Sequence, residues 1–254
     1  MNKNTHPIRI RFTQFHVRPT LAGMGLYFAP VVLTAPQIGR NADGLVTIKS
    51  LEGACARYTL DGSNPTDKSP LYTDPISLPK GGLIIAQAFP LTPVTNITGA
   101  GTATTRMELG PTRKKWKVVD CTSQDEDGQA RKAIDDDSKT LWHTRFRDGT
   151  DPMPHHVAVD LGKTRLIRGF TYTPRKDQWE NGIVMRARFE VSLDGTSWAI
   201  TADNVDFDNI VNSRQQQVFK FPTAVTARYF RFTALRTAHD NNIASAADIS
   251  ILVK

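Results

Sequence analysis

The sequence predicts an all-β chain built from two successive sandwiches. Apolar residues recur with period two along most of the chain, and turn dipeptides such as Asp-Gly follow at short intervals, whereas helical spacing is scarce. A length of 254 residues exceeds what one small sandwich uses. With 39% hydrophobic and 22% charged residues, the composition is that of an ordinary globular protein.

Residues 1–35 are expected to be the remnant of an upstream region, or a linker to it. Ile8, Ile10 and Phe12 alternate with polar residues, which predicts one half-buried strand over 8–13. No apolar stretch separates a basic start from a cleavage site, so we expect no signal peptide here. No apolar run approaches the roughly 20 residues that cross a bilayer, so no membrane insertion is expected.

Residues 36–110 are expected to form a small sandwich of the immunoglobulin or fibronectin type. Short strands are predicted over 45–48, 56–60 and 83–89. The second of them ends at Asp61-Gly62, a dipeptide typical of tight turns, and prolines stiffen the loop that follows.

This first unit resembles a known domain. It is similar to the small β-sandwich found after the catalytic barrel in chitobiase and β-hexosaminidase-like proteins, through Tyr58-Thr59-Leu60-Asp61-Gly62-Ser63-Asn64-Pro65-Thr66, then Ser69-Pro70-Leu71-Tyr72 and Pro75-Ile76. The resemblance implies the C-terminal region of such a glycoside hydrolase. In that family the unit is a spacer or scaffold, with no known chemistry in the motif.

Residues 111–254 are expected to form a larger sandwich after a boundary near Gly110. Strands are predicted over 157–162, 169–172, 186–195, 228–233 and 249–253. About eight strands of this length close naturally into a jelly roll.

The densest polar stretch of this second unit holds Asp135, Asp136 and Asp137. Three successive carboxylates repel one another unless water solvates them or a cation joins them. Hard oxygen ligands at this spacing suit Ca²⁺. A solvated acidic loop is the alternative, and the residues alone leave both interpretations open.

Six ordered motifs over residues 112–254 resemble the coagulation factor V/VIII type C, or discoidin, domain. They are Asp135-x-Asp137-x-x-Thr140-x-Trp142, Val159-Asp160-Leu161-Gly162, Tyr172-x-Pro174-Arg175, Val191-Ser192-x-x-Asp194-Gly195-x-x-Trp198, Ala227-Arg228-Tyr229-Phe230-Arg231 and Ala244-Ser245-Ala246-Ala247-Asp248-Ile249. In bacteria such domains are family 32 carbohydrate-binding modules. The resemblance implies a discoidin-type jelly-roll β-sandwich, stapled by calcium, whose loops at one end hold a sugar.

The resemblance also implies the ligands of a structural calcium ion that joins the start of this sandwich to its end. They are the carbonyl of Lys132, the side chain of Asp135, the carbonyl of Asp137, Thr140, and, near the C-terminus, Ala247 and Asp248. Two positions depart from the family. Asp136 stands where the family usually has glycine, and Asp248 replaces a longer glutamate. Bound Ca²⁺ would stabilise the folded sandwich by mass action.

A sugar site is implied in the same way. The resemblance makes Phe146 the stacking platform, Arg175 the donor pair to vicinal hydroxyls, and His143 and Asn181 further hydrogen-bond partners. A flat ring and a few convergent polar groups are what a hexose requires. The last loop has Asn241-Asn242-Ile243 where the family often has an aromatic residue, so the identity of the sugar stays open.

Other candidate residues have simpler interpretations. Trp116, Trp142 and Trp198 are expected in the core, and His155 and His156 in a surface loop. Arg145, Arg147 and Arg175 could instead pair with Asp148 and Asp151 in a solvated loop. Cys55 and Cys121 match no metal spacing and are expected to be free.

Catalysis and nucleic-acid binding are not expected of these residues. Neither unit is long enough for a glycosidase barrel, and nucleophile elbows and phosphate-binding glycine loops are missing. The net charge of +7 arises mostly in residues 1–35 and is dilute elsewhere, without the basic stripe that phosphate recognition requires.

We therefore expect a monomeric, non-catalytic region that binds galactose, N-acetylhexosamine or fucose-type glycans. It would target an attached glycoside hydrolase, such as a chitobiase or β-hexosaminidase, in the periplasm or outside the cell. The alternative is a structural or cell-surface adhesion domain of the discoidin type that contacts proteins or phospholipid and binds no sugar. Such domains use exposed apolar residues at loop tips, for which Met153 and Ile243 are the candidates.

Overall fold

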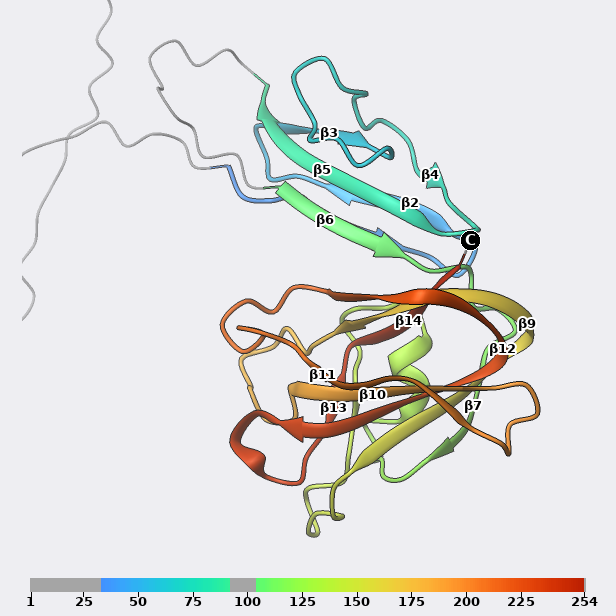
Figure 1. The fold of residues 1–254 in the computed structure, drawn as a ribbon. Helices are drawn as coiled ribbons and strands as arrows, with labels where there is room; N and C mark the ends of the chain where they lie inside the picture. The colour runs from blue at the N-terminus through green and yellow to red at the C-terminus, as the bar shows by residue number, and fades with distance from the viewer. Residues whose placement is uncertain (1–32, 92–103, 254) are drawn as a thin grey trace, which may run out of the picture.

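The computed structural model describes residues 33–91 and 104–253 (Figure 1). This part of the chain is all-β, as predicted, and its only helices are two short 3-10 turns, η1 (Ala130–Ile134) and η2 (Ala238–Asp240). It contains no helix of the length and hydropathy needed to cross a bilayer. The strand expected over 8–13 lies outside the described residues.

The first sandwich consists of two three-stranded antiparallel sheets, in the upper half of Figure 1. One holds β1 (Gln37–Arg40), β2 (Leu45–Lys49) and β4 (Ile76–Ser77), and the other holds β3 (Ala54–Thr59), β5 (Gly82–Pro90) and β6 (Thr104–Leu109). The predicted strands are all present. In β2, Val46 and Ile48 alternate with exposed residues and share one buried cluster with Ile84 and Ala86 of β5.

The second sandwich is one long antiparallel sheet that folds over itself. Its strands are β7 (Lys117–Cys121), β9 (His155–Thr173), β10 (Val184–Ser192), β11 (Ala199–Asp206), β12 (Gln217–Thr237) and β14 (Asp248–Val253), with the short pair β8 (Trp142–His143) and β13 (Ser245–Ala246) beside it. Register shifts interrupt the pairing of β9 with β12 near their middles. The first half of β9 therefore pairs with β7, and its second half pairs with β14, so each long strand serves both layers.

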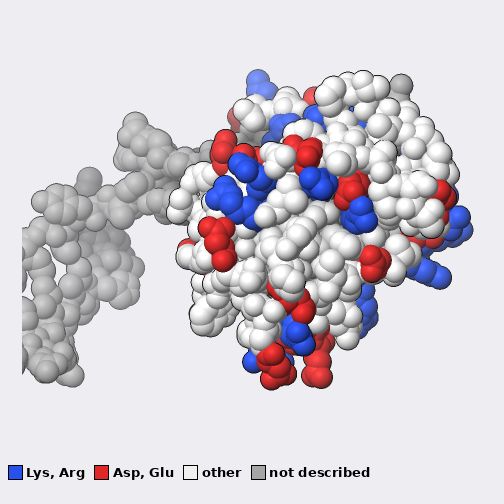
Figure 2. Space-filling view, turned by 60° about the horizontal axis from the view of Figure 1, so that its bottom comes forward, with Lys and Arg blue, Asp and Glu red and all other residues white. Residues whose placement is uncertain are grey.

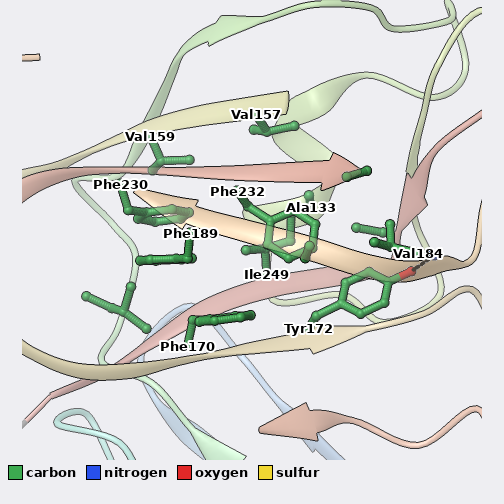
Figure 3. Packing of buried hydrophobic residues seen from close by; sticks show 14 of the residues in the cluster. Ala133, Val157, Val159, Phe170, Tyr172, Val184, Phe189, Phe230, Phe232 and Ile249 are labelled. Carbon is green, nitrogen blue, oxygen red and sulfur yellow. Dashed lines mark hydrogen bonds between the residues drawn. The ribbon is translucent and has the colours of Figure 1, made fainter. Parts of the chain in front are cut away.

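Aromatic rings fill the space between these layers (Figure 3). Phe170 and Phe189 stack with centroids 4.6 Å apart, and Tyr172 stacks on Phe232 at 5.4 Å. The Tyr172 hydroxyl accepts from the Val184 N–H and donates to the Ser245 carbonyl, and its burial raises the pKa of the phenol. The core thus fixes β9 against β10 and β13, which carry the loops of the candidate site.

Three expectations about single residues meet different outcomes. Trp116 and Trp142 are buried as predicted, whereas Trp198 is partly exposed beneath the Arg231 guanidinium, 4.6 Å from its ring. The prediction of a surface loop is wrong for His155 and His156, because both begin β9, where His155 is fully buried and His156 is partly buried. Both ring nitrogens of His155 have partners, the Thr122 hydroxyl and the Asn242 carbonyl, so burial leaves neither unsatisfied.

The two sandwiches meet at a buried junction. Gly110 and Pro111 of the connection are buried, and a Cβ at Gly110 would lie 2.1 Å from Ser250 Oγ. The Gln216 side-chain amide pairs with both backbone groups of Glu108 in β6, at 2.8 and 3.0 Å. Strand β6 of the first sandwich is therefore held directly against the second. Cys55 and Cys121 are free, as expected.

Candidate functional site

Two loops of the second sandwich are hydrogen-bonded to one short segment of the chain. They are the loop after β8 and the loop between β9 and β10, and the segment before β13 lies between them. The Thr144 N–H donates to the Ala244 carbonyl, and the Ser245 N–H donates to the Gly182 carbonyl. The two loops therefore lie on opposite sides of this segment, about 10 Å apart at these hydrogen bonds. The predicted sugar-binding residues belong to these two loops, and we call this surface the loop end.

Partners on both ring nitrogens and a glycine packed against the ring position His143. Its Nδ1 lies 3.1 Å from the Thr144 carbonyl, and its Nε2 lies 3.1 Å from an Asp127 carboxylate oxygen. Gly128 lies directly against the ring, and a Cβ there would be 2.4 Å from the imidazole. The side chain of His143 is 12% exposed, and these contacts fix its orientation.

Phe146 presents an exposed ring beside His143. Its residue exposure is 46%, and its ring centroid lies 5.3 Å from that of His143 at an interplanar angle of 57°. The Arg147 guanidinium lies 5.5 Å from the Phe146 centroid. An exposed aromatic face of this kind can receive the C–H face of a pyranose ring.

Arg175 is the most rigidly held charged group at the loop end. Its Nε and Nη2 both donate to the Asp177 carboxylate at 2.7 Å, and Nη1 donates to the Asn181 carbonyl at 2.9 Å. A guanidinium has five N–H groups, so two remain for a ligand. The hydrogen bonds from Arg175 hold the pKa of Asp177 below its ordinary value, so this carboxylate stays charged at neutral pH.

The alternative of ion pairing in a solvated loop is confirmed for one of its three arginines. Arg145 pairs with Asp151 as expected, whereas Arg147 pairs with Asp127 and Arg175 with Asp177. Lys and Arg groups alternate with Asp and Glu groups on the face in Figure 2. In Arg175 the pair leaves donors free, so pairing and ligand binding are compatible there.

The last loop braces the loop that carries Arg175 and Asn181. The Asn241 side-chain amide donates to Asn181 Oδ1 at 3.2 Å, and His239 Nε2 lies 3.1 Å from a Glu180 carboxylate oxygen. Positive φ angles of 65° at His239 and 56° at Asn242 make this turn a strained one. The segment that lacks the expected aromatic residue therefore positions its neighbour.

Sequence reasoning missed Trp179, an exposed aromatic residue in the same loop. It is 55% exposed, and its backbone N–H donates to Asp177 at 3.2 Å. The signal was available, because a tryptophan between glutamine and glutamate in a loop has no apolar neighbour with which to enter a core. Trp179 adds a second ring to the loop end.

An acidic group at the loop end could hold a metal ion. Asp125, Asp127 and His143 offer ligand atoms that all lie within 4.8 Å of one another. Arg147 lies in the same group, 2.5 Å from Asp127 and 3.6 Å from Asp125. A guanidinium already supplies the positive charge that a metal ion would bring.

Half of the expected calcium set lies together in the loop after η1. The Thr140 hydroxyl donates to Asp135 Oδ2 at 2.7 Å and lies 3.1 Å from the Asp137 carbonyl oxygen. The Asp137 N–H donates to Asp135 Oδ1 at 2.9 Å, so both oxygens of Asp135 have partners. Lys132 lies in the middle of η1, just before this loop. The loop closes through its own hydrogen bonds.

The two C-terminal members of that set, Ala247 and Asp248, do not fit a calcium ion. Ala247 donates its N–H to the Thr173 carbonyl, and its neighbour Asp248 lies on the Arg113 guanidinium, with Oδ1 2.6 Å from Nη1 and Oδ2 2.7 Å from Nη2. Asp136 is likewise bonded to Arg40. A divalent cation would lie against two fixed positive charges, which the Coulomb term opposes strongly at a buried site. We therefore derive no role for the ion at Asp248.

Comparison with known proteins agrees with this architecture. The model of the F5/8 type C domain matches residues 118–249, and that of the chitobiase/beta-hexosaminidase C-terminal domain matches residues 36–92. Among solved structures, the CBM32-3 module from a family 31 glycoside hydrolase of Clostridium perfringens is 28% identical, with a TM-score of 0.50, and covers 55% of this chain and 92% of the module.

Two curated relatives share only part of their length with this chain. A galactose oxidase from Gibberella zeae is 29% identical over 140 residues, which are 55% of this chain and 20% of the oxidase. A sialidase from Micromonospora viridifaciens is 31% identical over 161 residues, which are 61% of this chain and 24% of the sialidase. This chain thus spans a quarter or less of each relative. The domains that match are non-catalytic accessory domains. The chain belongs to the F5/8 type C domain family, and a chitobiase/β-hexosaminidase C-terminal domain precedes that domain in it.

Proposed function

We propose that this chain binds a glycan, without catalysis, at the loop end of its second sandwich. The arrangement of Arg175 carries the proposal, because Asp177 and Asn181 fix its guanidinium and leave two N–H groups for a ligand. Two donors on one planar group match adjacent hydroxyls of a hexose, and Phe146 exposes a ring at the same end. The similarity to a carbohydrate-binding module supports the proposal.

A site of this size binds weakly on its own. A charge-assisted hydrogen bond contributes about 1.5 to 3 kcal/mol, and an aromatic contact contributes about 1 kcal/mol. Such terms correspond to dissociation constants in the micromolar to millimolar range. Weak binding suits a module that acts by avidity beside a catalytic domain.

We infer a galactose-type ligand with an axial hydroxyl, within the class of galactose, N-acetylhexosamine and fucose glycans. We also infer a monomer that is attached to a carbohydrate-active enzyme, in the periplasm or outside the cell. The relatives support the attachment, since one is named galactose oxidase, one is named sialidase, and the solved module comes from a glycoside hydrolase.

Retention on immobilised galactose tests the site. Arg175→Ala and Phe146→Ala should abolish retention while the melting temperature stays within a few degrees. Arg188→Ala is the matched control, because Arg188 makes a similar ion pair with Asp203 at a distant sheet face. Retention that survives in both loop variants would reject this site, and a wild-type protein that binds no glycan would reject the function.

The adhesion alternative rests on exposed apolar residues at the loop tips. Met153 packs against the core and Ile243 is only half-exposed, so neither forms a protruding apolar tip. Binding to phosphatidylserine liposomes, together with a glycan array that stays blank at millimolar sugar, would favour adhesion over the function proposed above.

Calcium has no step in this proposal. Its expected site stays a prediction of the family resemblance, supported by the grouping of Asp135, Asp137 and Thr140 but not by the contacts of Asp248. Melting temperatures of the chain in calcium and in EGTA test whether this site binds the ion.

A further inference from the structure

Four charged side chains meet at the junction of the two sandwiches, from segments far apart in the sequence. Arg40 is the last residue of β1 in the first sandwich, Arg113 lies in the connection, Asp136 lies in the loop after η1, and Asp248 begins β14. Their side-chain exposures are 3%, 5%, 7% and 20%. Charged side chains are rarely this buried unless they are paired.

Ion pairs connect all four side chains, although Arg40 Nε, Arg113 Nε and Arg113 Nη1 have no hydrogen-bond partner among the described residues. Arg113 grips both oxygens of Asp248, at 2.6 and 2.7 Å, and its Nε lies 3.4 Å from Asp136. Arg40 donates to the same Asp136 carboxylate and, through its other terminal nitrogen, to the Gly110 carbonyl. Two positive charges therefore face two negative charges. Burial lowers the pKa of Arg113, but the charge of Asp248 and that of Asp136 more than offset it, so the net shift is upward.

This group lies where the family resemblance places a calcium ion. Asp136 has a φ of 65°, the left-handed region that glycine adopts most easily, which explains why a glycine is usual at this position. Here an aspartate accepts that strain and directs its carboxylate to Arg40 and Arg113. Asp248 is one methylene shorter than the usual glutamate, and the Arg113 guanidinium lies directly on it. Both departures from the family pattern thus place a carboxylate on an arginine.

The group also spans both sandwiches. Arg40 belongs to the first sandwich and binds Asp136 of the second, while its contact with Gly110 fixes the connection between them. Gln216 and Glu108 clamp the same junction a short distance away. A calcium ion held within the second sandwich would join only the two ends of that sandwich.

We propose that Arg40 and Arg113 replace the structural calcium ion of the family, linking Asp136 to Asp248 and locking the first sandwich onto the second. The chain then folds as one two-domain body whose stability needs no divalent cation. Two guanidinium groups can do this because each has several donors in fixed directions, so that one side chain bridges two acceptors.

Thermal unfolding of the full chain tests the replacement. The wild-type melting temperature should be the same in 5 mM CaCl₂ and in 5 mM EGTA. Arg113→Gln should lower it by about 10 °C, since breaking a buried pair strands a charge. The control Arg188→Gln removes an exposed pair and should lower it by less than about 2 °C. A wild-type melting temperature that falls in EGTA would overturn the proposal. An Arg113→Gln protein with the same melting temperature as the wild type would overturn it as well.

Arg40→Gln tests the link between the two sandwiches in a variant that is expected to fold. It leaves Asp248 paired with Arg113 inside the second sandwich, so that sandwich should still fold. We expect the single unfolding transition of the wild type to split into two, and X-ray scattering to report a larger radius of gyration. A single transition and an unchanged radius in Arg40→Gln would refute the lock.

Discussion

The loop end and the junction of the second sandwich both rely on arginine–carboxylate pairs, with different consequences. At the loop end, Asp177 is 39% exposed and Arg175 is 12% exposed, and Arg175 keeps two N–H groups unused. At the junction, Arg113, Asp136 and Asp248 are 5%, 7% and 20% exposed, and two arginines neutralise two aspartates. The comparison teaches that the partners of the arginine decide the role of such a pair. A single pair that leaves donors unused can orient them for a ligand, whereas pairs that share a carboxylate hold segments together.

The largest effect should come from Asp248→Asn at the junction. This change leaves the Arg113 guanidinium buried without its main partner, and the free energy of unfolding should fall by about 3 to 5 kcal/mol. Urea unfolding of the full chain measures it. A loss below about 1 kcal/mol would place this pair in the same class as the exposed ones.

The corresponding change at the loop end, Asp177→Asn, should have the opposite profile. The free energy of unfolding should change by less than about 1 kcal/mol, because the carboxylate is 39% exposed to solvent. Galactose affinity should fall roughly tenfold, because the Arg175 fork loses the carboxylate that orients it. Calorimetric titration measures the affinity, and Asp203→Asn is the control for an ion pair outside the site. Equal affinities in the two variants would contradict the orienting role.

The pH dependence sharpens the same comparison. The pKa of Asp177 lies below its ordinary value of 3.8, so the carboxylate is charged above that pH and its contribution is lost as pH falls through the lowered value. The ratio of wild-type to Asp177→Asn affinity should stay constant from pH 7 to about pH 5 and fall toward one only below the ordinary pKa of 3.8. A ratio that already declines above pH 5 would show that another group governs the step.

Gly128→Ala should weaken sugar binding about fivefold. The added Cβ would lie 2.4 Å from the His143 ring, which must then turn away from the site. Ser138→Ala on the exposed acidic loop is a control with no contact to His143. Affinity that is unchanged in Gly128→Ala would remove His143 from the set of sugar-binding residues.

The smallest effect should come from Trp179→Ala. Its exposed ring offers one aromatic contact, so affinity for an oligosaccharide should fall about threefold while affinity for the monosaccharide stays the same. Glycan arrays with galactose and a galactose-containing trisaccharide compare the two. An equal loss for both ligands would place Trp179 in the primary site.

Period-two alternation predicted several strands, because a strand with one buried face leaves that pattern in the sequence, and β2 shows it directly. It did not predict β7 or β11, and in β10 the burial does not alternate, because Glu190 and Ser192 are buried as well. His155 was misplaced because its sequence neighbours, two prolines and a second histidine, resemble a loop. Only the structure shows that the Thr122 hydroxyl and the Asn242 carbonyl satisfy both nitrogens.

The candidate site was predictable in its residue types but not in its contacts. Phe146 and Arg175 were chosen from motif positions, and the structure places their loops at one end. The junction could not be predicted, because Arg40 and Asp136 are 96 residues apart and belong to different sandwiches. Local sequence patterns carry no information about such a distant pair. The only signal in the sequence was that Asp136 and Asp248 differ from the residues usual in the family.

The most direct test of the central claim is a titration of the ¹⁵N-labelled chain with galactose, followed by NMR. The account predicts chemical-shift changes confined to the amides of residues 143–147 and 175–182, with the junction residues 110–113 and 248 unaffected. Changes that cluster elsewhere in the chain, or none at millimolar galactose and N-acetylgalactosamine, would contradict it.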